Sequence, residues 1–314
     1  RQIRGFPPRA GRGRRAAHGG DVRPNGKADT MDLLCAPEAR TRLRRWENLS
    51  PFHPVALRLM RAAASDDVPL TEVAAIVRRD AVFAAEILRL ANSPMFGFRQ
   101  EIDSVLHAVC LLGPERVRGL ALTVALRRFL GAVLATEAAR VCWRHNLACA
   151  MVAEELALAL MMPSDAAYTA GLVHDLGRLA LLASDPNHYA AMLAEAEAKP
   201  SRLCALEREA FGVDHCQAGA TLMRHWGFPP ALCEVAVVHH QPLASGLIGS
   251  REIVQLACQT ADSLGFQVAG PEPRFDVEEL LRWLPDFAHP RIRRDAGDMA
   301  LTIAIRINTH EIQG

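Results

Sequence analysis

Alanine and leucine recur at helical spacing along almost the whole chain, and this pattern restricts the fold more than any other feature of the sequence. Aromatic residues make up only 5% of the chain, and the alternation of β-branched residues that indicates strands is nearly absent. The sequence therefore predicts an all-α protein. Half of the 314 residues are hydrophobic, so the chain can bury a sizeable core in one large domain or two modest ones.

Helix-capping and helix-breaking residues indicate where the helices begin and end. Asp80 and Ser104 are typical N-caps, and Gly113 followed by Pro114 is expected to end one helix and begin the next. Asp276 is expected to cap one clear helix in the last segment of the chain. We expect short helices up to about residue 130 and longer ones at 138–161, 166–182, 188–197, 201–210, 215–226, 231–239 and 250–264.

This change in helix length predicts a two-part helical bundle with a seam at residues 131–137. We place an N-terminal part of short helices at 36–135, packed on a second helical part at 136–266, with a C-terminal helical extension at 267–314. Residues 1–30 have eight basic and two acidic side chains and no apolar periodicity, so we expect a disordered basic leader there. Because Met31 follows directly, we favour an upstream translated or appended segment over a nucleic-acid-binding arm, and whether it is native stays an open question.

Charge and hydropathy exclude several classes of partner. Outside the leader, 28 basic residues stand against 33 acidic ones, so the folded parts lack the basic footprint that binds a phosphate backbone, and a nucleic-acid partner is not expected. No apolar run approaches the roughly 20 residues of a membrane-spanning helix, so we expect no membrane partner. The eight cysteines form no CxxC pair, and no apolar signal peptide is present, which indicates free thiols in a reducing cytoplasm.

Histidines gather in the second part of the chain, where seven of the twelve lie between residues 145 and 240. His174 and Asp175 adjoin in an apolar stretch, and a buried carboxylate beside an imidazole is costly unless a cation pairs with it. A metal ion would satisfy both groups. The structural alternative is that Asp175 pairs with Arg178 or caps the following turn.

Other polar side chains lie in similarly apolar surroundings. His239 and His240 together end an apolar helix, which is unusual for simple packing. His145 is flanked by core-facing residues, and His215 begins a helix with a buried stripe. Asp262 lies on a polar line beside an apolar helix face, where an acid is usually only solvated.

With these residues in place, the chain resembles the HDOD family, helical bacterial proteins related to HD phosphohydrolases and HD-GYP phosphodiesterases. The resemblance covers roughly residues 40–265 and implies an HD-like fold for the second helical part. His145 and seven segments carry it: 51–57, 80–93, 104–113, 170–177, 209–215, 226–229 and 239–242.

The resemblance also implies a metal site. The positions that match metal ligands of the wider HD group are His145, His174, Asp175, His215, His239, His240 and Asp262. Imidazole and carboxylate donors suit one or two ions of Fe, Mn or Zn, with Asp175 able to bridge two, although the site can also be empty. Two departures weigh against catalysis: Arg178 stands where active HD-GYP enzymes have a lysine, and the Gly-Tyr-Pro loop after His240 is missing, so no substrate pocket is evident.

Three functions follow as hypotheses. The first is a cytoplasmic signal-transduction or regulatory protein that acts mainly through a protein partner and is catalytically weak or inactive, with no catalytic residue assigned. The alternative is a metal-dependent phosphodiesterase or phosphohydrolase, for which a nucleotide is a candidate ligand. A third is a DNA-binding regulator built on the helices at 71–126, which is less favoured because that region is only mildly basic.

Overall fold

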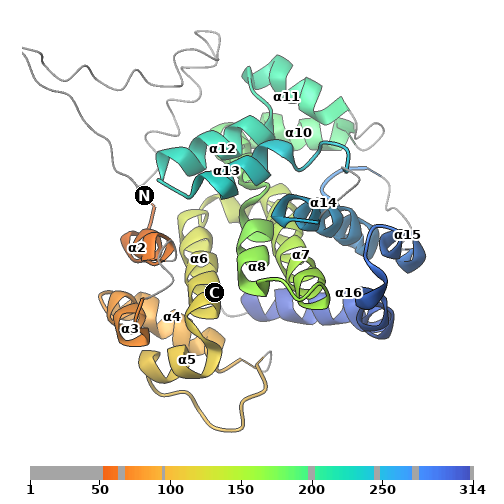
Figure 1. Ribbon diagram of the computed structural model, residues 1–314. Helices are drawn as coiled ribbons and strands as arrows, with labels where there is room; N and C mark the ends of the chain where they lie inside the picture. The colour runs from red at the N-terminus through yellow and green to blue at the C-terminus, as the bar shows by residue number, and fades with distance from the viewer. Residues whose placement is uncertain are drawn as a thin grey trace, which may run out of the picture. The chain divides into compact units, whose positions relative to one another are not determined.

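The computed structural model describes residues 52–62, 68–93, 96–196, 202–243, 248–270 and 276–311. The chain divides into two units, Arg1–Leu34 and Cys35–Gly314, and all described residues belong to the second. The predicted leader at residues 1–30 lies outside the described residues. Every regular element in the described ranges is helical, so the all-α prediction is confirmed (Figure 1).

The first part of the bundle consists of short helices whose ends follow the capping chemistry of the sequence. The Asp80 carboxylate accepts a 2.9 Å hydrogen bond from the backbone N–H of Phe83. The Ser104 hydroxyl accepts a 3.2 Å hydrogen bond from the backbone N–H of His107, at the start of the helix that follows. Gly113 has a φ of +83°, which glycine adopts without strain, and it separates two helices at the expected place. The helices are α2 (Pro54–Ala62), α3 (Leu70–Val77), α4 (Ala81–Ala91), α5 (Val105–Leu112) and α6 (Pro114–Phe129).

A cluster of aromatic rings packs the first part on the second. Phe52, just before α2, stacks on Trp226 with ring centroids 4.6 Å apart. Phe129, at the end of α6, meets the same indole edge-on at 4.8 Å. Trp226 directly follows α12 (His215–His225), and all three rings are at the boundary of the two sets of helices. Aromatic pairs of this geometry add stability beyond the area they bury.

The second part is built around α7 (Glu137–Ala159), which a short helical turn, η2 (Val133–Ala135), connects to α6 within the predicted seam. Most residues of α7 are buried, because helices pack against it from several sides. Figure 1 shows α8 and α14 beside it. Its neighbours are α8 (Ser164–Val173), α9 (Leu176–Ser184), α14 (Ser250–Ala261) and α16 (His289–Glu311).

The sequence predicted one continuous helix at 166–182, and this prediction was wrong. The chain breaks at 174–175, where Asp175 has φ −117° and ψ 27°, and α9 starts in a new direction. Close tertiary packing accompanies the break: Gly177, in the first turn of α9, lies so close to α12 that a Cβ atom would collide with the carbonyl oxygen of His215. Helix propensity and periodicity do not register such a contact.

Three further helices and one irregular turn complete the surroundings of this break. α12 packs against both α9 and α13, and the Asp214 carboxylate caps its start by accepting a 2.9 Å hydrogen bond from Gln217 N. The chain then turns irregularly after α14, at η4, where Gly265 has a φ of +89°. The remaining elements here are α10 (Pro186–Ala196), α11 (Leu203–Phe211), α13 (Pro230–Val238) and η4 (Asp262–Phe266).

The C-terminal extension contains more helix than the sequence indicated. The expected cap at Asp276 is present, and it begins α15 (Val277–Leu281), which is followed by η5 (Asp286–Ala288). The long helix α16 was not predicted, because arginines and aspartates interrupt its narrow stripe of apolar residues. It packs on α7, where Arg306 donates a 2.6 Å hydrogen bond to the buried Glu154 carboxylate. No described helix combines the length and apolar character needed to cross a lipid bilayer.

Candidate metal centre

The seven side chains predicted as metal ligands come from five places in the second set of helices and form one connected group. Neighbouring ring centroids lie 5.4 Å apart for His145 and His174, and 4.9 Å apart for His174 and His239. His215 Nε2 lies 3.6 Å from Asp175 Oδ1. The group comprises His145 on α7, His174 and Asp175 at the α8–α9 break, His215 at the start of α12, His239 and His240 after α13, and Asp262 after α14.

Three of these imidazoles are held with one nitrogen facing the protein and the other facing the group. Nδ1 of His174 lies 2.7 Å from the Gly171 carbonyl oxygen. Nδ1 of His239 lies 2.8 Å from the Ala236 carbonyl oxygen. Nδ1 of His215 is 2.6 Å from Glu207 Oε2. When each Nδ1 donates its proton to the facing oxygen, the neutral ring keeps a lone pair on Nε2, which is how metal-binding histidines are oriented in proteins.

The inward-facing atoms have no hydrogen-bond partner among the described residues. They are buried, and a buried polar atom without a partner is costly. Burial and the neighbouring imidazoles, His240 first, lower the pKa of His239 well below its ordinary value, so this ring stays neutral and can coordinate a cation. A divalent ion suits this donor set. The unpartnered atoms are His174 Nε2, Asp175 Oδ1, His215 Nε2 and His239 Nε2.

Arg178 contacts the second oxygen of the Asp175 carboxylate. Its Nε donates to Asp175 Oδ2, and its Nη2 lies 3.3 Å from His240 Nε2. Burial opposes ionisation of Asp175, but the Arg178 guanidinium and the imidazole of His215 hold the pKa of the carboxyl far below its ordinary value. Arg178 thus engages one oxygen of Asp175 and one nitrogen of His240, both predicted metal ligands. The ion pair of Asp175 with Arg178, which the sequence offered as the structural alternative to a metal, is therefore present. The other oxygen of the carboxylate, Asp175 Oδ1, has no hydrogen-bond partner among the described residues.

His145 faces sulfur on one side and oxygen on the other. Its Nδ1 lies 2.9 Å from the Phe266 carbonyl oxygen and 3.3 Å from Asp262 Oδ1. Its Nε2 lies 3.4 Å from Cys149 Sγ and 3.6 Å from Cys258 Sγ. The Asp262 carboxylate thus contacts the outer nitrogen of the ring, whereas the two thiols contact the inner one. Sequence reasoning missed both cysteines, although Cys149 follows His145 by four residues on one helix face.

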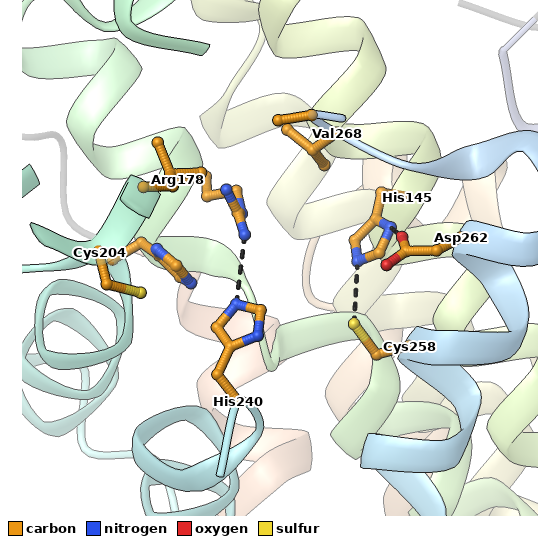
Figure 2. Close-up of a pocket in the computed structure, with 10 residues that line it drawn as sticks. His145, Arg178, Cys204, His240, Cys258, Asp262 and Val268 are labelled. Atoms are coloured by element: carbon orange, nitrogen blue, oxygen red, sulfur yellow. Dashed lines mark hydrogen bonds and ion pairs between the residues drawn. The ribbon is translucent and has the colours of Figure 1, made fainter. Parts of the chain in front are cut away.

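A pocket of about 380 Å³ opens onto this group, although the sequence offered no evident substrate pocket. Figure 2 shows His145 between Asp262 and Cys258 at one side of it, with Arg178 and His240 facing each other at the other. His240 is the most exposed imidazole of the group, and desolvation beside His215 and Arg178 lowers its pKa to about 4. A solute in this pocket therefore meets a neutral imidazole and a guanidinium.

Glu207, on α11, is a second residue that the sequence did not single out. It is fully buried, and its carboxylate accepts hydrogen bonds from Tyr189 Oη at 2.6 Å and from the backbone N–H of His215 at 2.8 Å, besides its contact with the His215 ring. Although burial opposes ionisation, His215 and Arg178 lower the pKa of Glu207. The regular apolar spacing of α11 gives no indication that one of its acids points inward. The Glu207 carboxylate, by its contact with Nδ1 of His215, directs Nε2 of this ring toward the other predicted ligands.

We expect Glu207→Gln to reduce the free energy of unfolding by about 1.5–3 kcal/mol, the contribution typical of hydrogen bonds to a charged group. Asp175 and Glu207 together raise the pKa of His215 against the effect of burial, so stability from its protonation is lost as pH rises through that pKa. Stability from ionised Glu207 is lost as pH falls through its lowered pKa.

The difference in the free energy of unfolding between wild type and Glu207→Gln should therefore be largest in weakly acidic solution, and it should be smaller at lower and at higher pH. Urea unfolding curves across this range measure it. Glu209→Gln, an exposed position on the same helix, is the control and should change stability by less than about 0.5 kcal/mol. Equal effects of the two substitutions would contradict the role assigned to Glu207.

Comparison with known proteins gives relatives of the same fold. An uncharacterized protein from Treponema pallidum (strain Nichols) is 25% identical over 190 residues, which are 59% of this chain and 36% of the relative. The chain thus spans about a third of the length of that curated relative. An HDOD domain protein of unknown function from Geobacter sulfurreducens has a TM-score of 0.61 at 23% identity, covering 86% of this chain and 97% of its own.

Two further solved structures share the fold. A predicted signal transduction protein from Marinobacter aquaeolei VT8 has a TM-score of 0.66 at 20% identity, covering 87% of this chain and 65% of its own. A predicted metal-dependent phosphohydrolase from Shewanella amazonensis SB2B has a TM-score of 0.57 at 22% identity, covering 85% of this chain and 97% of its own. At these identities the likeness concerns the fold alone. The HDOD domain profile, however, matches residues 49–242, well over half of the sequence, and the chain therefore belongs to the HDOD domain family.

Proposed function

We propose that this chain is a regulatory protein of a signal-transduction pathway that acts mainly through a protein partner and hydrolyses phosphoesters weakly or not at all. The observation that carries the proposal is the position of Arg178 against Asp175 and His240. A two-metal site in which Asp175 bridges the ions would use both oxygens of its carboxylate. Here one of those oxygens is held by a guanidinium that stays protonated at any physiological pH.

A regulatory role agrees with the name of the Marinobacter aquaeolei relative, a predicted signal transduction protein. The proposal keeps the divisions inferred from the sequence, with an N-terminal helical part at 36–135, an HD-like part at 136–266 and an extension at 267–314. It also keeps the cytoplasm as the compartment, because the seven cysteines in the described ranges are all free thiols.

Turnover of phosphoesters by metal-loaded protein tests the proposal. We expect no measurable hydrolysis of cyclic dinucleotides, nucleotides or an activated aryl phosphodiester after loading with Mn, Fe or Zn. His174→Ala protein, purified in parallel, measures the background from contaminating phosphatases. Robust turnover that is lost in His174→Ala and in Asp175→Asn would overturn the proposal.

That outcome would favour the second candidate, a metal-dependent phosphohydrolase. Its support is the set of unpartnered donors, His174 Nε2, Asp175 Oδ1, His215 Nε2 and His239 Nε2, next to a pocket of about 380 Å³. These residues would hold the ion, and a bound divalent metal supplies a hydroxide at neutral pH. Glu207 and the Gly171 carbonyl would keep the rings oriented, while His240 and Arg178 would face a nucleotide phosphate in the pocket.

A further inference from the structure

We infer that His145, Cys149, His174 and Cys258 form a thiolate-containing site for one soft divalent cation of the zinc class. All four residues are buried, and one ligand atom from each lies within 4.8 Å of the corresponding atom of every other. Two imidazoles and two thiolates are a donor set that zinc takes in closed structural sites. The inference does not depend on the proposed regulatory function, because it concerns which ion is bound and by which atoms.

Two distances between ligand atoms match the edges of a tetrahedral site. With zinc–sulfur bonds of about 2.3 Å and zinc–nitrogen bonds of about 2.0–2.1 Å, the nitrogen–sulfur edge of a tetrahedron is about 3.6 Å long. The inner nitrogen of His145 lies 3.4 Å from Cys149 Sγ and 3.6 Å from Cys258 Sγ. The two thiols thus already stand at the separation from this ring that a shared ion would impose.

The unpartnered nitrogen of His174 points to an ion rather than to a plain network of hydrogen bonds. Two thiols approach His145 Nε2, but its single lone pair can accept only one proton. His174 Nε2, which belongs to the same four-atom group, is buried without a hydrogen-bond partner of ordinary geometry among the described residues, and Cys258 is the group that faces it. Loss of both thiol protons on binding a cation would give each of the four atoms a partner.

The inference assigns Asp262 a different task from the one expected of it. Its carboxylate lies 3.3 Å from His145 Nδ1, on the face of the ring away from the sulfurs, as Figure 2 shows. A carboxylate in that position orients a ligating histidine and raises its basicity without touching the metal. Asp262 is then a positioning residue, and the four ligands join α7, the end of α8 and α14.

A second group that contains thiols lies nearby but is less suited to the same ion. It consists of Cys204, His215, Cys216 and His240. His240 Nε2 already faces Arg178 at 3.3 Å, and His215 Nε2 faces Asp175 at 3.6 Å. Cys204 is only partly buried and His240 is exposed, whereas all four residues of the first group are buried, as the ligands of a closed structural zinc site are.

Cobalt substitution tests the site on the full chain. Protein purified under reducing conditions is stripped with a chelator and loaded with Zn²⁺ or Co²⁺. We expect about one ion per chain, with thiolate-to-cobalt charge-transfer absorption in the near ultraviolet and the strong visible bands of a tetrahedral complex. Cys149→Ala and Cys258→Ala should lose the charge-transfer absorption in part, and the double variant should lose it entirely.

Two matched variants separate this site from general effects of removing a thiol. Cys142→Ala removes an equally buried thiol from the same helix, and Cys204→Ala removes one from the pocket-side group; both should keep the cobalt spectrum. Asp262→Asn should keep the spectrum but weaken the affinity about tenfold to a hundredfold, the range typical of groups that orient a ligand.

The inference is overturned if cobalt binds to wild-type protein without charge-transfer absorption, since the ion is then held by histidine and carboxylate alone. A Cys149–Cys258 disulfide in peptides from protein kept under reducing conditions, or the absence of any metal uptake, would overturn it as well. The wild-type spectrum decides the matter even if a cysteine variant fails to fold. Because phosphoester turnover is measured separately, failure of this inference leaves the proposed function standing, and the reverse also holds.

Discussion

Gly177→Ala is expected to destabilise the protein by about 3 kcal/mol or more, because the new methyl group cannot be accommodated by side-chain movement alone. The atoms in its way are the backbone carbonyl of His215 and the backbone N–H of Gly219, both on α12. Relief requires α9 and α12 to separate. Since His215 begins α12 and Asp175 immediately precedes α9, the same movement would pull apart His215 Nε2 and Asp175 Oδ1, which lie 3.6 Å from each other.

Urea unfolding and metal uptake measure the two consequences of Gly177→Ala. The matched control is Gly297→Ala, an exposed glycine in α16 with no atom within 4 Å of an added Cβ. That substitution should stabilise the protein by about 0.5–1 kcal/mol through helix propensity. If Gly177→Ala unfolded at the wild-type urea concentration and bound metal normally, the close approach of α9 to α12 would be wrong.

Arg178→Met is expected to cost about 3–5 kcal/mol in metal-free protein, since it leaves the buried Asp175 carboxylate without its cation. Methionine fills most of the volume of the arginine stem, so lost packing contributes little. A divalent cation should restore much of the loss, because Asp175 Oδ2 and His240 Nε2 become free to bind it. Unfolding midpoints with and without Mn²⁺ measure both effects.

The pH dependence of this loss follows from the lowered pKa of Asp175. Its contribution to stability is present above its ordinary pKa of about 4 and is lost as pH falls toward the folded value. The difference in the free energy of unfolding between wild type and Arg178→Met should therefore become smaller as the pH falls below about 4. Arg208→Met, which breaks a pair between a half-exposed arginine and Asp214, should cost no more than about 1 kcal/mol. Equal losses for the two arginines would refute the buried pairing.

Local chemistry was enough to predict the ends of many helices. The caps at Asp80 and Ser104 and the stop at Gly113 depend on side-chain oxygens and on a positive φ, which are properties of the residues themselves. The break after His174 and the helix α16 could not be predicted in this way. The first occurs where α9 packs closely on α12, and the second packs on α7, and neither tertiary contact is visible in local propensity.

The same distinction applies to the candidate site. The seven residues indicated by the family resemblance do lie together, while their role as metal ligands stays a prediction. Glu207, Cys149 and Cys258 were missed because a glutamate or a cysteine on an amphipathic helix reads as an ordinary surface or core residue. Only the fold reveals that they face an imidazole.

The helix α12 has His215 at its first residue and Trp226 just beyond its last. Its eleven residues form a rod about 16 Å long, and a helix of that length is stiff. Phe52 and Phe129 pack on Trp226 at the C-terminal end of α12. A displacement of these two rings would therefore either separate the aromatic contacts or tilt α12. A tilt of α12 would also displace His215, so this one helix joins the packing of α2 and α6 to the candidate metal centre.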